Sequence, residues 1–370
     1  MYTSEDPRKA ELIGQVVSEA RKRVAPENAG EVERFIRRYF ALVAPDDIIY
    51  TKLETLLGGA LSLWEFGRER APDTAKLRLL NPSPDREGWD TEHTVVEMVN
   101  DDMPFLVDSL TADFALHDRL VHLIIHPIVL VRRDADGRRI DASLDPDQGQ
   151  EFAESYMHIE IDQKTDAPEI EVIRSRIEKV LADVRSAVTG WPPMRRKLAE
   201  VLDQLDRAHP PVPADELEES KEFLRWLDDE NFVFLGYREY RFITENGNDY
   251  LQLVPESGLG LLRAVRPESA ERGKMPFSAE FSQFARRKEI LIVAKANNRS
   301  TVHRSVHMDR VSVKEFDDNG RLIGEHRFLG LFTSAAYARS VKFIPMLRRK
   351  ANRIIERAGL GATSHAGKAL

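Results

Sequence analysis

The 370-residue sequence contains no cysteine. This absence excludes disulfide bonds, thiolate zinc sites, iron–sulfur ligation and a cysteine nucleophile. It suits a reducing compartment. The polar segment Met1–Lys9 has no apolar stretch of the kind that a secretory signal peptide needs. We therefore expect a cytoplasmic protein.

Long hydrophobic runs and excess positive charge are also missing. The longest apolar run, Leu123–Val131, includes a histidine and a proline, and it falls far short of the ~20 residues of a membrane helix. The chain has 54 Lys and Arg against 62 Asp and Glu, a net charge of -8. An acidic chain has no general attraction for phosphate backbones. We expect neither a membrane nor a nucleic acid as a partner.

Motifs of nucleotide binding and nucleophilic catalysis are missing as well. Gly258-Leu259-Gly260 lacks the third glycine and the βαβ context of a dinucleotide loop. There is no phosphate-loop signature and no Gly-x-Ser-x-Gly elbow. The carboxylates Asp228, Asp229 and Glu230 end a predicted helix and precede a strand, and they are typical of a solvated turn. We therefore predict no catalytic residue and no bound cofactor in this chain.

The composition that remains is that of a globular α+β protein. Hydrophobic residues make up 42% and charged residues 31%, and the length suits two or three domains. Residues 1–90 are predicted to form helices followed by a linker. Apolar residues recur with helical spacing from Val32 to Val43, and Asp46 is placed to cap the next helix. Residues 71–92, rich in Pro, Asp and Gly, are typical of a linker.

Residues 91–190 alternate between strand and helix patterns. The order is strand, helix, strand, strand, helix, which is most of a ferredoxin-like βαββαβ unit without its fourth strand. The predicted elements are strand Thr94–Val99, helix Phe105–His117, strand Leu120–Arg132, strand Ser155–Asp162 and a long helix from Asp166 to Val188.

The second half of the chain predicts a helical connector and another sheet. Residues 191–230 contain two helices, near Met194–Ala208 and Pro213–Asp229, after Trp191-Pro192-Pro193. Residues 231–335 contain two strands with a hairpin turn at Asn246-Gly247, a short helix near Ser278–Arg286, and three strands, an order that resembles a PAS-type antiparallel sheet. Residues 336–370 contain a helix, Tyr337–Ala358, with a basic face that suits solvent or a neighbouring domain, and a tail that looks cut in mid-course.

The turn between the first strand and helix of residues 91–190 is the candidate binding site. Backbone N–H groups at a helix N-terminus favour carboxylate ligands, and ferredoxin-like regulatory modules use this turn for amino acids. An ordinary helix cap made by the Asp pair and the proline is the alternative, and the spacing alone favours it. The candidate residues are Asn100, Asp101, Asp102, Met103, Pro104 and Phe105.

Histidines gather in the same region, at positions 117, 122, 126 and 158. His122 and His126 are four apart in a predicted strand, so they should share one face. A metal site would need a third ligand, with His158 on the neighbouring strand as the candidate. Packed strand histidines are the commoner arrangement, and the same holds for His303 and His307. We predict no metal.

Four segments together resemble one protein family, and the resemblance extends in order over nearly the whole chain. The family is that of the large bacterial NAD-specific glutamate dehydrogenases, and the match is to its N-terminal region. The last of the four segments is the most specific. They are Met103-Pro-Phe-Leu-Val-Asp-Ser109, His126-Pro-Ile-Val-Leu130, Glu154-Ser-Tyr-Met-His-Ile-Glu160 and Trp226-Leu-Asp-Asp-Glu-Asn-Phe-Val-Phe-Leu-Gly-Tyr237.

This resemblance implies a parent enzyme that oxidises L-glutamate to 2-oxoglutarate and ammonium with NAD. It implies that residues 91–190 are an ACT-type module, that residues 231–335 are a PAS-like module, and that the catalytic domain lies downstream. We therefore expect a regulatory and oligomerisation segment that is not catalytic by itself. Its expected partners are the downstream catalytic domain, further copies of itself and an amino-acid effector. A purely structural assembly module is the alternative.

Overall fold

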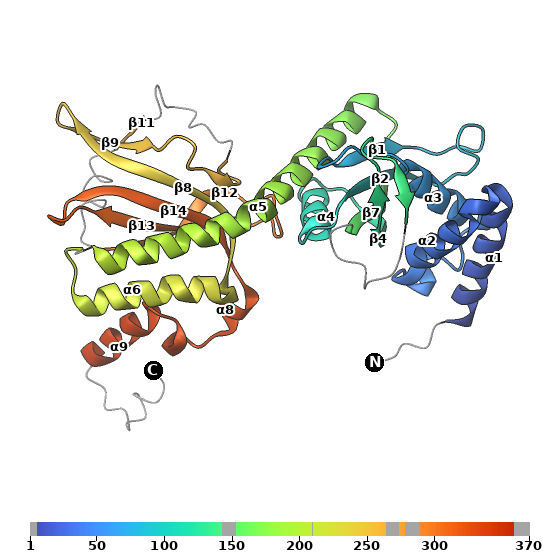
Figure 1. The fold of residues 1–370 in the computed structure, drawn as a ribbon. Coiled ribbons are helices and arrows are strands. Elements are labelled where there is room, and N and C mark those ends of the chain that lie inside the picture. Colours follow the sequence, from blue (N-terminus) through green and yellow to red (C-terminus); the bar gives the residue numbers. More distant parts are fainter. Residues whose placement is uncertain (1–5, 143–152, 209, 264–273, 278–288, 359–370) are drawn as a thin grey trace. The chain divides into compact units, whose positions relative to one another are not determined.

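The computed structural model describes residues 6–142, 153–208, 210–263, 274–277 and 289–358. The chain divides into two compact units, Met1–Ala182 and Asp183–Leu370 (Figure 1). Each unit has its own hydrophobic core. The helix predicted near Ser278–Arg286 lies outside the described residues.

Three helices begin the first unit: α1 (Pro7–Arg23), α2 (Ala29–Ala41) and α3 (Leu53–Phe66). The predicted apolar stripe of α2 is confirmed, because its members from Val32 to Phe40 are buried. The predicted cap is wrong. Asp46 lies in a short 3₁₀ turn, and α3 begins only at Leu53 without a side-chain cap.

The sheet of this unit is antiparallel, in the order β1-β2-β7-β3, with β4 also paired to β7. The edge position beside β2 belongs to β1, which precedes β2 in the sequence. A strand therefore lies inside the stretch that is predicted to be a linker. Its five residues are flanked by Pro, Asp and Gly, and these turn residues dominate the local composition. The strands are β1 (Lys76–Leu80), β2 (His93–Asp101), β3 (Val121–Ile125), β4 (Ile128–Leu130) and β7 (Ala153–Asp162).

Helices cover both faces of this sheet. The helix α4 (Leu106–Leu116) and the beginning of α5 (Ala167–Arg207) lie on one face, where Arg176 of α5 pairs with Asp113 of α4 at 2.8 Å. The helices α1 to α3 lie on the other face and share a core with Val99 of β2 and Tyr156 of β7 (Figure 1). Because side chains alternate along a strand, each strand contributes side chains to both faces of the sheet.

The single strand predicted from Leu120 to Arg132 is wrong. It is divided into β3, β4 and β5 (Arg132–Arg133), and β5 pairs with β6 (Arg139–Asp141). Pro127 separates β3 from β4 because it has no backbone N–H to donate to a neighbouring strand. Its carbonyl still accepts a hydrogen bond from the backbone of Tyr156, at 3.0 Å.

The helix break predicted at Trp191-Pro192-Pro193 is also wrong, because α5 continues through both prolines. Each proline removes one backbone hydrogen bond. The buried face nevertheless continues across them, from Val184 and Ala187 to Met194 and Leu198. Packing on both sides of the prolines therefore outweighs the local preference to end the helix.

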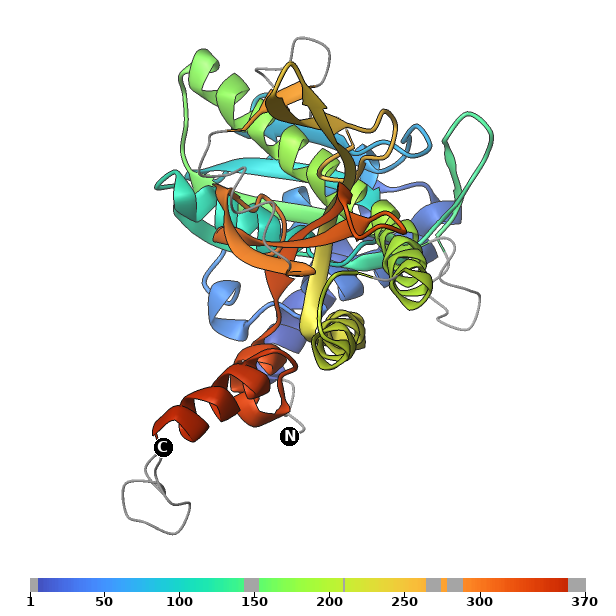
Figure 2. The ribbon, with the colours of Figure 1, turned by 90° about the vertical axis from the view of Figure 1, so that its left-hand side faces the viewer.

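The second unit contains an antiparallel sheet in the order β11-β9-β8-β14-β13-β12, with β10 also paired to β8. The predicted hairpin is confirmed: Asn246 and Gly247 have φ of 53° and 80°, as a two-residue turn requires. The second half of α5 and α6 (Ala214–Trp226) share a core with this sheet (Figures 1 and 2). Its strands are β8 (Phe232–Glu245), β9 (Asn248–Leu253), β10 (Leu259–Gly260), β11 (Lys274–Pro276), β12 (Leu291–Arg299), β13 (His307–Phe316) and β14 (Leu322–Phe332).

The helix predicted from Tyr337 to Ala358 is interrupted. It consists of α8 (Ser334–Ala338), a 3₁₀ turn and α9 (Leu347–Ala358). Pro345 favours an extended residue before it, and Ile344 is extended. The start of α9 contacts α6, where Arg348 pairs with Glu219 at 2.7 Å. None of the described helices combines the length and apolar character that crossing a lipid bilayer requires.

Candidate functional site

The predicted binding turn does connect a strand to a helix: β2 ends at Asp101 and α4 begins at Leu106. The predicted cap, however, is wrong. The N-cap residue is Phe105, in the left-handed conformation with φ of 73° and without a side-chain cap, and Pro104 precedes the helix. The Phe105 carbonyl accepts hydrogen bonds from the backbone N–H and the Oγ of Ser109, at 3.0 and 2.6 Å. The two aspartates form other contacts.

Asp102 is tied to the neighbouring strand β7. The hydroxyl of buried Ser155 donates to Asp102 Oδ1 at 2.6 Å, and His126 Nε2 lies 2.9 Å from Ser155 Oγ. Burial lowers the pKa of His126, against a smaller opposing effect from Asp102. In a nucleophilic triad the serine donates to the histidine. Here it donates to the carboxylate, so the three residues form a structural chain.

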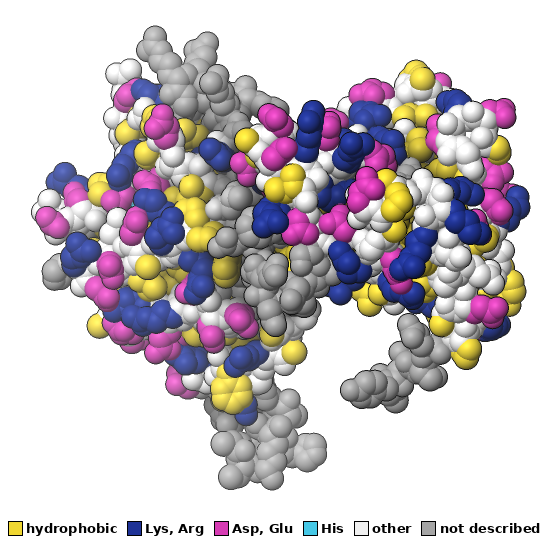
Figure 3. Space-filling model, turned by 45° about the vertical axis from the view of Figure 1, so that its right-hand side comes forward, with side chains coloured by type: hydrophobic (Ala, Val, Ile, Leu, Met, Phe, Trp, Pro, Cys, Tyr) yellow, Lys and Arg dark blue, Asp and Glu magenta, His cyan; other side chains and the backbone are white. Residues whose placement is uncertain are grey.

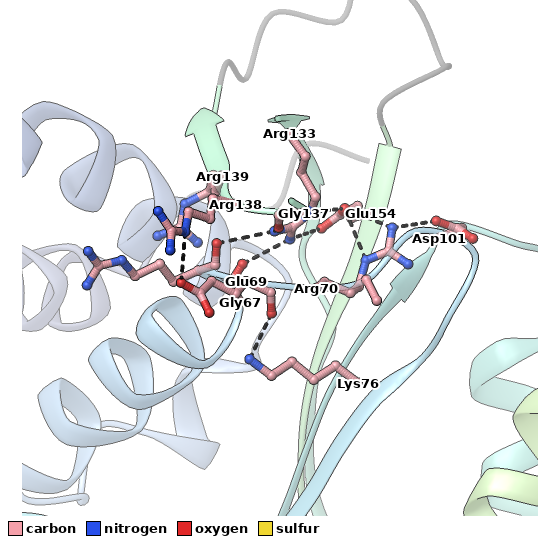
Figure 4. Close-up of polar contacts among 12 residues, drawn as sticks. Gly67, Glu69, Arg70, Lys76, Asp101, Arg133, Gly137, Arg138, Arg139 and Glu154 are labelled. Atoms are coloured by element: carbon pink, nitrogen blue, oxygen red, sulfur yellow. Dashed lines mark hydrogen bonds and ion pairs between the residues drawn. The ribbon is translucent and has the colours of Figure 1, made fainter. Parts of the chain in front are cut away.

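Asp101 belongs to a buried ion-pair network (Figure 4). Nη2 of Arg70 lies 2.5 Å from Asp101 Oδ1 and 2.9 Å from Glu154 Oε1. Nη1 of Arg70 donates to the carbonyl of Thr74 at 2.7 Å. Arg70 follows α3, Asp101 ends β2 and Glu154 begins β7. The network therefore joins the end of the helical layer to the sheet beside the turn.

A second guanidinium, that of Arg133, completes this network. Its Nε and Nη2 donate to the two oxygens of Glu154, both at 2.7 Å, and it also reaches the carbonyls of Gly67 and Gly137. Burial alone would lower the pKa of Arg133, but its pairing with Glu154 outweighs burial and raises it. Two arginines thus balance two carboxylates.

The backbone around the network is fitted closely. The backbone N–H of Arg70 donates to the Gly137 carbonyl at 3.0 Å. Gly137 has φ of +80°, and a Cβ there would lie 2.2 Å from the carbonyl oxygen of Arg70. Sequence reasoning missed Arg70 and Arg133, which lie just before the predicted linker and just after a predicted strand. The one local signal is Glu154, a carboxylate at the start of an otherwise buried strand.

The histidines do not form one group. His122 Nε2 lies 2.9 Å from Asp162 Oδ1, and its ring stacks on His93 with centroids 4.1 Å apart, whereas His126 contacts Ser155. The predicted shared face of His122 and His126 is wrong, because the strand register shifts between Val121 and Leu123 and β3 ends at Ile125.

Further along the chain, His303 lies in a bend with φ of 67°, and His307 begins β13. Within the described residues, no group of three or more His, Asp or Glu side chains has an arrangement that holds a metal ion. The remaining motifs have structural contacts. Asp228 pairs with Arg195 at 2.6 Å, and Gly260 pairs with Gly236 in the sheet.

Surface charge is mixed on the face drawn in Figure 3, where Lys and Arg side chains lie among Asp and Glu side chains. This mixture differs from the continuous basic stripe of a nucleic-acid-binding face.

Comparison with known proteins identifies the relatives of this chain. Residues 35–177 match the ACT1 domain of glutamate dehydrogenase, and residues 344–370 match helical motif 1 of glutamate dehydrogenase. The NAD-specific glutamate dehydrogenases of Halomonas elongata and Pseudomonas aeruginosa are each 33% identical to it, over 100% and 98% of this chain. The chain belongs to the NAD-specific glutamate dehydrogenase family. The enzyme of that name from Mycobacterium tuberculosis is 27% identical over 72% of this chain.

This member of the family spans only part of its relatives. It covers 23% of the Halomonas protein and 22% of the Pseudomonas protein. The ACT1 match begins within α2 and includes β1, so it takes in helices on both faces of the sheet. The turn Asn100–Phe105 lies inside this match, and its role in effector binding stays a prediction.

Proposed function

We propose that this chain is the regulatory and assembly segment of a larger, cytoplasmic NAD-specific glutamate dehydrogenase. The parent would convert L-glutamate, NAD and water to 2-oxoglutarate, ammonium and NADH, with NAD bound outside this chain. The main support is an ACT1 domain inside a match that covers all of this chain and 23% of a relative of that name. The downstream part of the parent would be its partner.

The effector site of this proposal is the turn Asn100–Phe105. Phe105 supplies no side-chain cap to α4, and the first N–H groups of a helix have no partners within it. They would suit the carboxylate of an amino acid. The exposed Asp102 would face its ammonium group, while Asp101 is already paired with Arg70.

Isothermal titration calorimetry with a panel of amino acids tests the effector role. We expect saturable heat with at least one amino acid and weaker binding by Asp102→Asn, because asparagine still accepts the Ser155 hydrogen bond but has no charge. Asp136→Asn, an exposed aspartate in the β5–β6 connection, is the matched control and should bind normally. If the folded chain responds to none of the amino acids, the sensing role is wrong.

A purely structural assembly role is the second candidate. It is favoured by large apolar side chains that remain exposed near the C-terminal helices. Tyr337, Phe343 and Ile354 are 66%, 63% and 60% exposed. Such side chains are typical of surfaces that associate. Sedimentation velocity over a range of concentrations would show a mass above the 42.2 kDa of one chain. A monomer at every concentration would contradict this role.

We also propose that residues 231–335 are a PAS-like module. Its five long strands, counted from β8, lie in the order second, first, fifth, fourth, third, which supports a PAS-type sheet. An experimental structure of this region with a different strand order would contradict the assignment.

A further inference from the structure

A cavity of about 520 Å³ lies in the first unit, between helices α2 and α3 and the sheet face that they cover. Tyr39 and Gly59 line it from the helices, and His93, His158 and Glu160 line it from β2 and β7. It is at the beginning of β2, whereas the turn Asn100–Phe105 is at the end of that strand. The cavity is therefore separate from the proposed effector site.

The wall of this cavity contains a buried histidine with one unused acceptor. His158 is 2% exposed, and its Nε2 lies 3.3 Å from Glu160 Oε1. A proton on Nε2 suits that carboxylate, which leaves Nδ1 as an acceptor. Among the described residues, His158 Nδ1 has no hydrogen-bond partner. A buried polar atom without a partner costs about 1–3 kcal/mol, so a ligand that donates to Nδ1 would be favoured.

Glu97 is a buried carboxylate next to His158, although it does not itself line the cavity. Glu97 lies directly opposite His158 in the strand register and is fully buried. Its Oε2 pairs with Arg78 at 2.5 Å, while its Oε1 has no hydrogen-bond partner in the described part of the chain. Burial raises the pKa of the Tyr39 phenol, and the nearby charges of Glu97 and Glu160 raise it further. His158 lines the cavity and its unused Nδ1 accepts hydrogen bonds, so the ligand it suits is a donor.

The charge around the cavity points the same way. Four carboxylates line it, those of Asp47, Asp90, Glu92 and Glu160, against the single ammonium of Lys52. Burial opposes ionisation of Glu160, but hydrogen bonds from His158 and His93 outweigh it and lower the Glu160 pKa. The negative charge favours a cation. A metal ion is a poor candidate, because no suitable group of three ligands occurs within the described ranges.

A glycine keeps space open beside the unused nitrogen. A Cβ at Gly59 of α3 would lie 3.2 Å from His158 Cε1 and 3.3 Å from the Tyr39 hydroxyl. These distances are tighter than ordinary van der Waals contact. In a helix, glycine is less stable than alanine by about 1 kcal/mol. The close contacts that a Cβ would make with His158 and Tyr39 give a reason for glycine at this position.

We propose that this cavity binds a small organic cation with a primary ammonium group. The ammonium donates a hydrogen bond to His158 Nδ1, and the charge of Glu160, with that of nearby Glu97, offsets its own. An ammonium group has three donors and no acceptor, which matches an acidic wall with an unused acceptor at His158 Nδ1.

Calorimetry of the unmodified chain with 1,4-diaminobutane and n-butylamine tests this site. Butan-1-ol and butyrate are the neutral and anionic controls of similar size. We expect saturable binding of at least one amine and none of either control. If the folded chain binds no amine, or binds butan-1-ol as well as n-butylamine, the proposal is wrong.

Two variants locate the binding within the cavity. Gly59→Ala and Glu160→Gln should each raise the amine Kd at least about tenfold, which corresponds to about 1.4 kcal/mol. Gly14→Ala is the matched control for the first, because a Cβ at Gly14 meets nothing within 4 Å. Asp102→Asn, in the effector turn, should leave amine binding unchanged. Unchanged amine affinity in folded Gly59→Ala and Glu160→Gln chains would overturn the assignment.

Discussion

Arg70 and Glu154 form an ion pair 2.9 Å long, and the side chains of both are only 5% exposed. The two residues are 84 positions apart. Their contact fixes the segment after α3 against the first residues of β7, next to the turn that we propose as the effector site. Because Arg70 also pairs with Asp101, these contacts hold one end of that turn against the sheet.

Substitution of the two carboxylates in this network should destabilise the first unit by unequal amounts. Glu154→Gln leaves two buried guanidiniums without their shared partner and should destabilise the first unit by about 3–5 kcal/mol. Asp101→Asn removes a partner that is 34% exposed, and should cost less than about 1 kcal/mol. Hydrogen exchange of β2 and β7, read by mass spectrometry, measures both. Equal protection in the two variants would contradict a stabilising role for the network.

Two glycines with the same backbone conformation separate strain from close packing. Gly88 and Gly137 have φ of +75° and +80°, but a Cβ meets nothing near Gly88, whereas at Gly137 it meets the Arg70 carbonyl. Gly88→Ala should lower the free energy of unfolding by the cost of the left-handed conformation alone, about 1–2 kcal/mol. Gly137→Ala should lower it further and weaken the protection of amides around Arg70 from hydrogen exchange. Similar exchange rates in both variants would show that Gly137 is not closely packed.

Local patterns are enough to predict several elements of the fold. The stripe from Val32 to Phe40 is buried in α2, and Asn246-Gly247 forms the β8–β9 turn, because both signals depend on neighbours in the sequence. The path of α5 through Pro192 and Pro193 is not predicted by such patterns. Burial on both sides of the prolines is a tertiary effect that the local pattern does not contain.

The candidate site is predicted in position but not in its contacts. The turn Asn100–Phe105 joins a strand to a helix as expected, yet its carboxylates contact Arg70 and Ser155, which are distant in the sequence. Sequence reasoning missed His93, which stacks on His122. It also placed His122 and His126 on one face, which the irregular register of β3 prevents. Pairings between distant segments depend on strand register, which the sequence alone does not give.

The buried position of His126 predicts a dependence of stability on pH. Burial lowers its pKa from the ordinary value of 6.5. Above that pH both the folded and the unfolded chain hold it neutral. As the pH falls below 6.5, the unfolded chain binds a proton that the folded chain does not, so the free energy of unfolding decreases until the pH passes the folded pKa.

Replacing His126 by glutamine should remove this loss, because glutamine keeps an N–H for Ser155 and does not titrate. Urea denaturation at pH 7 and pH 5 measures it: the unmodified chain should lose more stability than His126→Gln. His307→Gln, at an exposed position, is the control and should behave like the unmodified chain. An equal loss in the unmodified chain and His126→Gln would contradict the pH effect.

A buried tyrosine in the second unit gives the last prediction. The Tyr237 hydroxyl donates to Glu239 Oε1 at 2.7 Å and lies 2.9 Å from His326 Nδ1, and burial together with the Glu239 contact raises its pKa. Tyr237→Phe keeps the ring but leaves His326 Nδ1 without this partner, at a cost of about 1–3 kcal/mol. The control Tyr337→Phe, at a residue 66% exposed, should change stability by less than about 0.5 kcal/mol. Faster hydrogen exchange in β8 and β14 of Tyr237→Phe alone is the expected result, and unchanged exchange there would show that the hydroxyl does not stabilise the sheet.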